Sequence, residues 1–294
     1  MAFNWQTFRT RTLTAAVFVV VMLTGVLWNQ WSFLILFSII HFGCWWEYFK
    51  LIEKIHNTFF HPYVKVGMMT IGYALMLWFC GPAYEINGYG LKQNLSLTVS
   101  VAGFVVLLVG IFQKNPIKLK AFGAAALGLL YISLSWGLMM DVFSVSRDIH
   151  VHDTMIILQG YPIPVIIIAS IWINDTMAYI VGSIIGKTPL SKISPKKTWE
   201  GTVGGIILCI VVTSFLLPLI LFGESDLAFS FFVAIVAFIA SITGTFGDLL
   251  ESKLKRMANV KDSGHIMPGH GGFLDRFDSL LLATPAVWLY INFS

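Results

Sequence analysis

The chain has 294 residues, of which 57% are hydrophobic and only 12% are charged, and its formal net charge at pH 7 is +4. Its mean hydropathy of +0.79 excludes an ordinary soluble domain. Apolar runs of about 20 residues, enough to cross a bilayer as a helix, recur along the chain. They are continuously apolar rather than alternating, so we expect helical spans and not the strands of a barrel.

These runs predict an all-α, polytopic integral membrane protein with nine transmembrane helices. In chain order the predicted spans are 12–28, 31–49, 64–80, 96–113, 121–141, 162–186, 203–222, 227–247 and 275–293. The first run lacks a small-x-small cleavage site and is expected to be retained. The last is the weakest, because it is short and contains Pro285. Residues 1–294 are taken as a single membrane domain: 1–161 supplies mainly spanning helices, and 162–294 adds cytosolic loops that carry polar motifs.

The basic residues predict how the helices are oriented. With the N-terminus in the cytosol and the C-terminus on the opposite side, all of the 19 Lys and Arg except Lys92 and Arg147 fall on the cytosolic side. This agrees with the positive-inside rule, which one helix more or fewer near the N-terminus would break. Two long basic loops, 187–202 and 248–274, then face the same compartment and can meet.

The first concentration of polar chemistry begins inside a predicted span. Asp175 lies about eleven residues before Gly186, so about 16 Å into the membrane on a regular helix. A charge at that depth costs roughly 2.5–3.5 kcal/mol and indicates function by default, with a hydrogen-bonded packing role as the alternative. Gly182 and Gly186 have GxxxG spacing, which we interpret as close helix packing. The segment GSIIGKT is not a P-loop, because its glycines are one residue too close and no strand precedes it.

Downstream, the segment SPKKTWEG lies at the entrance to the next span. Lys196 and Lys197 could be anchors that snorkel to the membrane surface. Anchoring does not explain the Ser, Pro, Thr, Glu and Gly around them. These residue types favour a phosphate-binding turn, in which backbone N–H groups and lysines are the donors.

Two further polar segments follow. Asp248 lies at the cytosolic end of a predicted span, within GTFGDLLESKLKR; a solvated charge run after a helix is the alternative. The stretch KDSGHIMPGHGGFLDRFDS then occupies 261–279. Its glycines and proline exclude a regular helix and leave backbone N–H groups free. Asp275 and Asp278 are expected in the first turn of the last helix, whose N-terminus partly stabilises their charge.

The three aspartates Asp248, Asp275 and Asp278 would repel one another near one membrane boundary, and a divalent cation removes that conflict. Oxygen ligands suit Mg²⁺, which commonly binds through one or two carboxylates together with substrate phosphates. Such a site beside Lys, Arg and Gly-rich turns suits phosphoryl or nucleotidyl transfer, where the protein mainly positions phosphates and neutralises charge. The membrane setting predicts that one substrate is a lipid.

Residues 252–278 resemble the signature of the phosphatidate cytidylyltransferases, also called CDP-diacylglycerol synthases. The family pattern is Ser, then Lys-Arg, Lys-Asp, His-Gly-Gly and Asp-Arg-x-Asp. The residues here that match it in type and spacing are Ser252, Lys255, Arg256, Lys261, Asp262, His270, Gly271, Gly272, Asp275, Arg276 and Asp278. Met267 is a mild departure from the usual Leu, Ile or Phe. SPKKTWEG with Gly204 and Gly205 resembles a second family segment.

The resemblance implies that CTP and phosphatidate react to give CDP-diacylglycerol and pyrophosphate. It also implies an all-helical membrane fold, a homodimer, metal held by Asp248 and Asp275, and a monovalent cation such as K⁺ beside Mg²⁺. Asp278 is then a third ligand or an orienting residue. The expected catalytic residues are Asp248, Asp275, Asp278, Lys255, Arg256 and His270, and His270 either shuttles a proton or fixes the loop by a hydrogen bond. Lys196, Lys197, Lys255, Arg256 and Arg276 would hold the triphosphate or the phosphatidate headgroup. Ser252, Lys261, Asp262, His270, Gly271 and Gly272 would shape the nucleotide loop, and Asp175 would line a polar cavity where the lipid headgroup enters.

Three other functions fit the sequence less well. A CTP-dependent polyprenol or phytol kinase is the nearest alternative, but its hydroxyl acceptor would want a general base, and the complete signature disfavours it. The Asp-Gly-x-x-Ala-Arg opening of the CDP-alcohol phosphotransferases is absent from the sequence. A transporter should show repeated halves with interrupted helices, but the sequence has no such symmetry and its polar residues concentrate in the C-terminal third. The expected partners are CTP and membrane lipid rather than nucleic acid, and the expected location is a bacterial inner membrane with the active site facing the cytosol.

Overall fold

The structure is a computed structural model that describes residues 5–113, 118–151, 154–223, 227–265 and 271–293. It divides into two compact units. Unit 1 comprises Met1–Met140 and Leu254–Phe277, and unit 2 comprises Asp141–Lys253 and Asp278–Ser294. The prediction of a single membrane domain stays a prediction.

Unit 1 is built from helices and their connections. Its elements are α1 (Trp5–Leu27), α2 (Gln30–His56), α3 (Pro62–Trp78), a short 3₁₀ turn η1 (Pro82–Tyr84), a π-helical turn η2 (Leu91–Leu95), α4 (Ser96–Ile111), α5 (Leu119–Ala126), a second π-helical segment η3 (Leu129–Leu134) and most of α6 (Ser135–Ser144).

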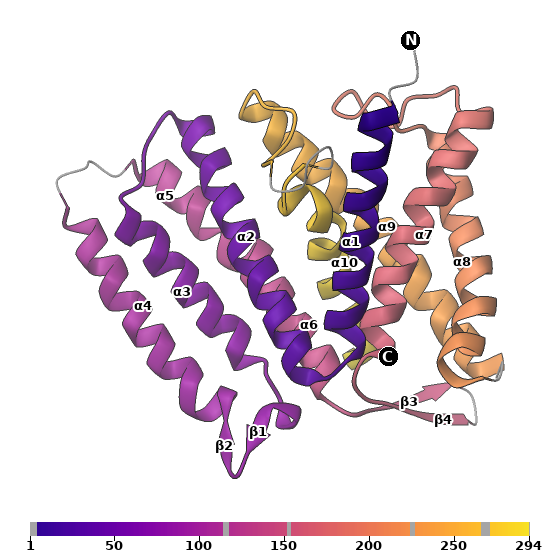
Figure 1. The fold of residues 1–294 in the computed structure, drawn as a ribbon, viewed down its shortest axis with the longest axis horizontal. Coiled ribbons are helices and arrows are strands. Elements are labelled where there is room, and N and C mark those ends of the chain that lie inside the picture. Colours follow the sequence, from indigo (N-terminus) through magenta and orange to yellow (C-terminus); the bar gives the residue numbers. More distant parts are fainter. Residues whose placement is uncertain (1–4, 114–117, 152–153, 224–226, 266–270, 294) are drawn as a thin grey trace. The chain divides into compact units, whose positions relative to one another are not determined.

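Asn29 caps α2 by accepting from the backbone N–H groups of Trp31 and Ser32, which satisfies donors that have no partner in the first turn. Helices α3 and α4 run side by side (Figure 1), and Gly67 and Gly110 let their backbones approach.

The helices of unit 2 carry Asp175, Asp248, Asp278 and the end of the segment SPKKTWEG. They are α7 (Pro162–Ile185), α8 (Trp199–Phe222), most of α9 (Leu227–Met257) and most of α10 (Leu274–Phe293). Helices α7 and α8 pack closely: a Cβ on Gly205 would lie 2.7 Å from the Cβ of Ala178, and a Cβ on Gly204 would lie 2.6 Å from Val181 Cγ1. Close approach through small residues is the usual way in which membrane helices pack.

Two small antiparallel hairpins interrupt the helices. Strands β1 (Glu85–Ile86) and β2 (Tyr89–Gly90) are joined by Asn87 and Gly88, whose φ angles of 50° and 79° are both positive. That combination is the usual two-residue turn of a tight hairpin. Strands β3 (Arg147–Val151) and β4 (Thr154–Leu158) pair in the second hairpin. Both hairpins lie between predicted spans, and the all-α class is confirmed.

Each predicted span overlaps a helix in the described part of the chain. Six helical segments there are long and apolar enough to cross a membrane: Gln30–His56, Leu91–Ile111, Leu119–Ser144, Pro162–Ile185, Trp199–Leu221 and Leu227–Met257. The structure therefore confirms a polytopic membrane protein. The spans predicted over α1, α3 and α10 stay predictions, and so does the total of nine.

Helix α9 is longer than the sequence predicted. The apolar run ends at 247, but the helix continues ten residues further, to Met257. Leu, Glu, Lys and Arg are good helix formers, so a charged segment need not end a helix that leaves the membrane. The helix ends just before Asn259, whose φ of 54° is left-handed, as is common where helices stop. The predicted loop 248–274 is thus helical over its first ten residues.

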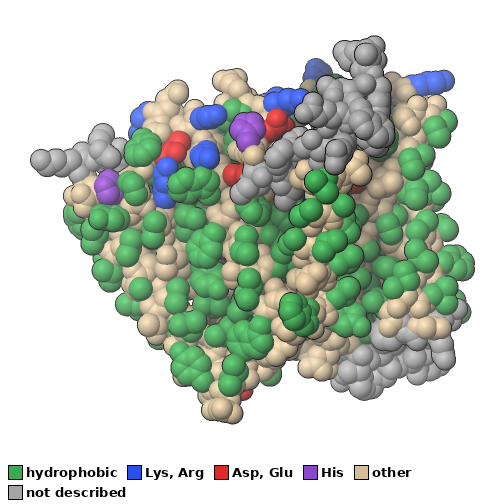
Figure 2. All heavy atoms as spheres, in the orientation of Figure 1, with side chains coloured by type: hydrophobic (Ala, Val, Ile, Leu, Met, Phe, Trp, Pro, Cys, Tyr) green, Lys and Arg blue, Asp and Glu red, His purple; other side chains and the backbone are tan. Residues whose placement is uncertain are grey.

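Basic side chains gather where α2 ends, as the charge pattern predicts. Lys65 Nζ lies 2.8 Å from Glu53 Oε1, and Lys118 Nζ donates to the carbonyl oxygens of His56 and Asn57 at 3.0 and 2.8 Å. Figure 2 shows charged side chains at this end of unit 1 and hydrophobic ones along the length of its helices. This is the distribution expected of helices that cross a bilayer and end at its polar surface.

Candidate active site

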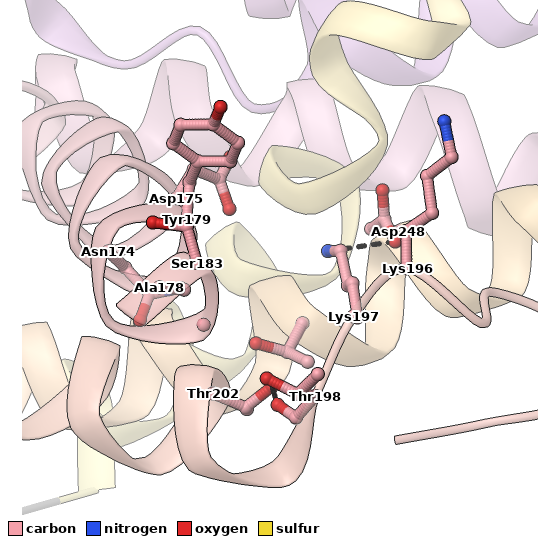
Figure 3. A pocket seen from close by; sticks show the side chains of 12 residues that line it. Asn174, Asp175, Ala178, Tyr179, Ser183, Lys196, Lys197, Thr198, Thr202 and Asp248 are labelled. Atoms are coloured by element: carbon pink, nitrogen blue, oxygen red, sulfur yellow. Dashed lines mark hydrogen bonds and ion pairs between the residues drawn. The ribbon is translucent and has the colours of Figure 1, made fainter. Parts of the chain in front are cut away.

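A cavity of about 370 Å³ opens among the polar residues of unit 2 (Figure 3). Its lining comes from α7, the segment before α8, the start of α8 and the second half of α9. The lining residues are Asn174, Asp175, Ala178, Tyr179, Gly182, Ser183, Lys196, Lys197, Thr198, Thr202, Thr245 and Asp248. Asp175, Lys196 and Lys197 were predicted to bind substrate and Asp248 to bind metal, so the structure brings these four residues together around one cavity.

The centre of this group is an ion pair. Lys197 Nζ lies 2.9 Å from Asp248 Oδ2, and Figure 3 shows the two side chains pointing toward each other while Lys196 extends in another direction. Burial by itself would lower the pKa of Lys197. The negative charges of Asp248, Asp175 and Asp278 outweigh burial, and the pKa of Lys197 is raised above its ordinary value. Lys197 is therefore paired with Asp248, and the charges of Asp175 and Asp278 further favour its protonated form.

The segment before α8 is held by its own side chains. Thr198 caps α8, because its hydroxyl accepts from the N–H of Gly201 at 3.1 Å. Glu200, in the first turn, accepts from the N–H groups of Lys187 and Thr188 at 3.2 and 3.1 Å. Part of the predicted phosphate-binding turn thus satisfies its own backbone donors. Lys197 directly precedes this capped helix start, which positions it beside Asp248.

The signature segment is organised in unit 1 around Asp275. Lys255 Nζ lies 2.6 Å from Asp275 Oδ1. Asp275 Oδ2 accepts from the N–H groups of Ser263 and Gly272, each at 2.8 Å, and from the Ser263 hydroxyl at 2.9 Å. Gly271 has a φ of +84°, and a Cβ there would also crowd Asp275 Oδ2. Asp275 Oδ2 therefore holds the loop that precedes α10, while Oδ1 pairs with Lys255 near the end of α9.

A second carboxylate, which the sequence analysis did not single out, completes this arrangement. Glu47 of α2 is only 4% exposed. It accepts from the N–H groups of Phe273 and Leu274 at 3.0 and 2.9 Å, and from the Ser263 hydroxyl at 2.7 Å. A signal was available, because Glu47 is the only acidic residue in the predicted span 31–49, and an acid within a span is by default functional.

Several other predicted residues lie in or near the same loop. Lys261 and Asp262 line a cavity of about 670 Å³ together with Lys50 and Lys54 of α2. Arg256 and Arg276 are both exposed, and Arg256 donates to the carbonyl oxygen of Val260 at 3.4 Å. Ser252 is half-buried on α9. The predicted residue His270 lies outside the described residues.

The predicted metal ligands have different surroundings. In the described part of the chain, no group of three or more His, Cys, Asp or Glu side chains has the arrangement of a metal site. Asp248 and Asp278 both act on Lys197 together with Asp175, and this excess of oxygen-bearing negative charge fits a hard divalent cation. Asp275 Oδ1 is paired with Lys255, so a metal bound there would have to displace that lysine.

The fold and the polar clusters define an integral membrane protein whose charged side chains suit phosphate chemistry rather than a redox or zinc centre. A family model described as "Cytidylyltransferase family" matches residues 9–294, so the chain belongs to that family and is a nucleotidyltransferase.

Curated relatives agree with this assignment. The chain is 30% identical over 280 residues to "Phosphatidate cytidylyltransferase" of Staphylococcus saprophyticus, covering 94% of this chain and 96% of that protein. It is 34% identical over 226 residues to the protein of the same name from Bacillus subtilis, covering 75% and 77%. A chloroplast relative, "Phosphatidate cytidylyltransferase 4, chloroplastic" of Arabidopsis thaliana, is 33% identical over 220 residues, and the match spans 68% of this chain and 54% of that longer protein.

Proposed function

We propose that this enzyme transfers the cytidylyl group of CTP to phosphatidate and so forms CDP-diacylglycerol and pyrophosphate. The observation that carries the proposal is the match to the Staphylococcus saprophyticus phosphatidate cytidylyltransferase, which extends over 94% of this chain. The signature residues expected to handle the nucleotide lie within that family match, which covers residues 9–294. The polar clusters supply the charges that such a reaction needs.

The reaction needs little covalent participation by the protein. A phosphate oxygen of phosphatidate attacks the α-phosphorus of CTP. The new phosphorus–oxygen bond replaces the bond to the β-phosphate, and pyrophosphate leaves with the electron pair. The attacking oxygen is already ionised near neutral pH, so no general base is needed. Catalysis then depends on holding the two phosphates in line and neutralising their charge.

Lys197 and the acidic residues around it are the best-placed groups for this task. A triphosphate or a lipid phosphate is a strong partner for an ammonium group, and Lys197 is held at a fixed helix start. Asp248 and Asp278 would hold Mg²⁺, with Asp175 adding negative charge nearby; the donors are all oxygens, as this cation prefers. When bound, the cation neutralises phosphate charge. K⁺ beside it, and direct ligation by Asp275, remain predictions from the family resemblance.

The signature loop, whose described residues are 261–265 and 271–273, would bind the nucleotide. Asp275 holds this loop through the N–H groups of Ser263 and Gly272, and its first residues, Lys261 and Asp262, line a cavity with Lys50 and Lys54. We place the active site on the cytosolic face of a bacterial inner membrane, because CTP is cytosolic and most of the basic residues are predicted on that side. A homodimer is also expected from the resemblance.

The test is a turnover assay on detergent-purified protein with phosphatidate and CTP labelled separately at the α and γ positions. Transfer of the α label to lipid, with Mg²⁺-dependent release of pyrophosphate and loss of both in EDTA, is the expected result. Transfer of the γ label to an alcohol acceptor would make the protein a lipid kinase and overturn the proposal. A polyprenol should be included as that acceptor, since it is the nearest alternative substrate.

A further inference from the structure

The buried carboxylate of Glu47 connects α2 to the signature loop at a point where the chain changes from loop to helix. Its two oxygens lie within hydrogen-bonding distance of three donors: the N–H groups of Phe273 and Leu274 and the hydroxyl of Ser263. Phe273 directly precedes α10 and Leu274 is the first residue of that helix. Glu47 therefore caps α10 from a distance of more than 220 residues in the sequence.

A cap of this kind has a clear physical basis. The first N–H groups of a helix have no partner within the helix, and the N-terminus carries partial positive charge. A carboxylate accepts hydrogen bonds from these N–H groups, and its negative charge is attracted to the helix N-terminus. Its hydrogen bonds are charge-assisted and therefore strong. Removing the Glu47 side chain would take away the acceptor of the Phe273 and Leu274 N–H groups. Donors left unsatisfied inside a protein destabilise the folded state, so the carboxylate stabilises this arrangement.

Gly264 and the signature residue Gly272 make room for this carboxylate. A Cβ added to Gly264 or to Gly272 would overlap the carboxylate oxygens of Glu47. Neither glycine has a positive φ angle, so backbone conformation does not require glycine at these positions. The reason for a glycine at both positions is the closeness of Glu47. The loop and the helix α2 thus fit together around one charged group.

Glu47 also reaches the Asp275 cluster through a shared serine. The Ser263 hydroxyl lies 2.7 Å from Glu47 Oε2 and 2.9 Å from Asp275 Oδ2. A serine hydroxyl has one proton and can donate to only one of these carboxylates at a time. The position of Asp275, and with it the pairing of Asp275 with Lys255, therefore depends on how Glu47 holds Ser263 and the start of α10.

We infer that Glu47 is a positioning residue for the transfer reaction: it fixes the signature loop and the first turn of α10, so that Lys261, Asp262 and Asp275 face CTP in a working arrangement. The inference rests on the proposed function for its kinetic part. It predicts that replacing Glu47 disturbs only the signature loop and the start of α10. Such a replacement should raise the KM for CTP or lower kcat and leave the rest of the protein folded.

The experiment compares Glu47→Gln and Glu47→Asp with the wild type. Glu47→Gln keeps the size of the side chain but points an NH₂ group at N–H donors, and we expect kcat/KM for CTP to fall on the order of 100-fold. Glu47→Asp keeps the charge on a shorter stem and should restore part of the activity. The control is Glu53→Gln on the same helix, where Glu53 pairs with Lys65 and accepts from the N–H of Phe60; its turnover should stay near that of the wild type.

A second readout does not depend on activity. Hydrogen exchange of the peptide covering 261–276 should become faster in Glu47→Gln, with unchanged exchange in α7 and α8. Gly272→Ala should give the same local and kinetic defect, because its Cβ meets the carboxylate. Combining Gly272→Ala with Glu47→Asp should be milder than the sum of the two single changes, since the shorter acid makes room.

Wild-type turnover and unchanged loop exchange in Glu47→Gln would overturn the inference. Additive effects of Gly272→Ala and Glu47→Asp would do so as well, even if Glu47→Gln failed to fold. If the wild type itself were inactive with phosphatidate, the proposed reaction would fail, but the exchange and suppression results would still decide the role of Glu47.

Discussion

Lys197 Nζ and Asp248 Oδ2 lie 2.9 Å apart. This ion pair joins the segment before α8 to the second half of α9, two parts of the chain that are about 50 residues apart in the sequence. Their basic and acidic motifs were predicted to face the same compartment and to be able to meet, and within unit 2 they do meet. A lysine paired in this way is both positioned and kept charged, which suits it to a substrate phosphate.

The first prediction concerns Asp248. Replacing it with Asn should lower kcat/KM by about 100-fold or more, because Lys197 loses its ionic partner and the expected Mg²⁺ loses a carboxylate. Steady-state assays over a range of Mg²⁺ concentrations check this, and the concentration for half-maximal activity should rise. Asp141→Asn is the matched control, since Asp141 accepts from Trp288 Nε1 at 2.6 Å and an amide can also accept. Equal activity of Asp248→Asn and Asp141→Asn would contradict the prediction.

The second prediction concerns the pH dependence of Lys197. Its ordinary pKa is about 10.4, and the surrounding carboxylates raise it further despite burial. The side chain is therefore protonated throughout the neutral range, and its contribution is lost only as the pH rises through the raised pKa. The activity ratio of wild type to Lys197→Met should be constant between about pH 6 and pH 9. A midpoint in this ratio near neutral pH would be inconsistent with the observed surroundings. Lys192→Met, an exposed lysine of the same segment, should have little effect.

The third prediction separates Asp275 from Asp278. Asp275→Asn should abolish turnover without unfolding the protein, because Asp275 is predicted to be catalytic and also holds Lys255, Ser263 and Gly272. It should in addition make hydrogen exchange faster in residues 261–276. Asp278→Asn should instead raise the Mg²⁺ requirement and leave that exchange unchanged, since Asp278 acts on Lys197. Similar exchange in the two variants would argue against this division of roles. An active Asp275→Asn enzyme would remove Asp275 from the metal and catalytic assignments.

The fourth prediction concerns the packing of α7 against α8. Gly205→Ala places a Cβ within 2.7 Å of Ala178 Cβ and 2.8 Å of Ala178 N, so we expect a destabilisation of about 1–3 kcal/mol from overpacking. Thermal unfolding in detergent would show it as a lower midpoint. Gly123→Ala in α5 is the control, because a Cβ there has no neighbour within 4 Å, and Ala should be neutral or slightly stabilising in a helix. A lower midpoint for Gly123→Ala than for Gly205→Ala would disprove the packing argument.

The sequence by itself determined much of this protein. Continuous apolar runs predicted helices at positions that the structure confirms, because an unpaired backbone cannot lie in lipid. The charge pattern predicted that Lys50, Lys54, Lys65 and Lys118 belong to the same end of the helices. The signature spacing indicated the cytidylyltransferase family before any contact was known. Such features depend only on the type and spacing of residues along the chain, so the sequence is enough to predict them.

The tertiary structure alone decided which polar groups meet. Asp248 and Asp275 were grouped by residue type and predicted location, yet Asp248 pairs with Lys197 while Asp275 holds Lys255 and the signature loop. Glu47 stood alone in an apolar run, and nothing near it in the sequence indicated that it caps α10. A buried carboxylate takes whichever donors the packing of distant helices brings within about 3 Å, and that choice is made by the folded chain rather than by local sequence.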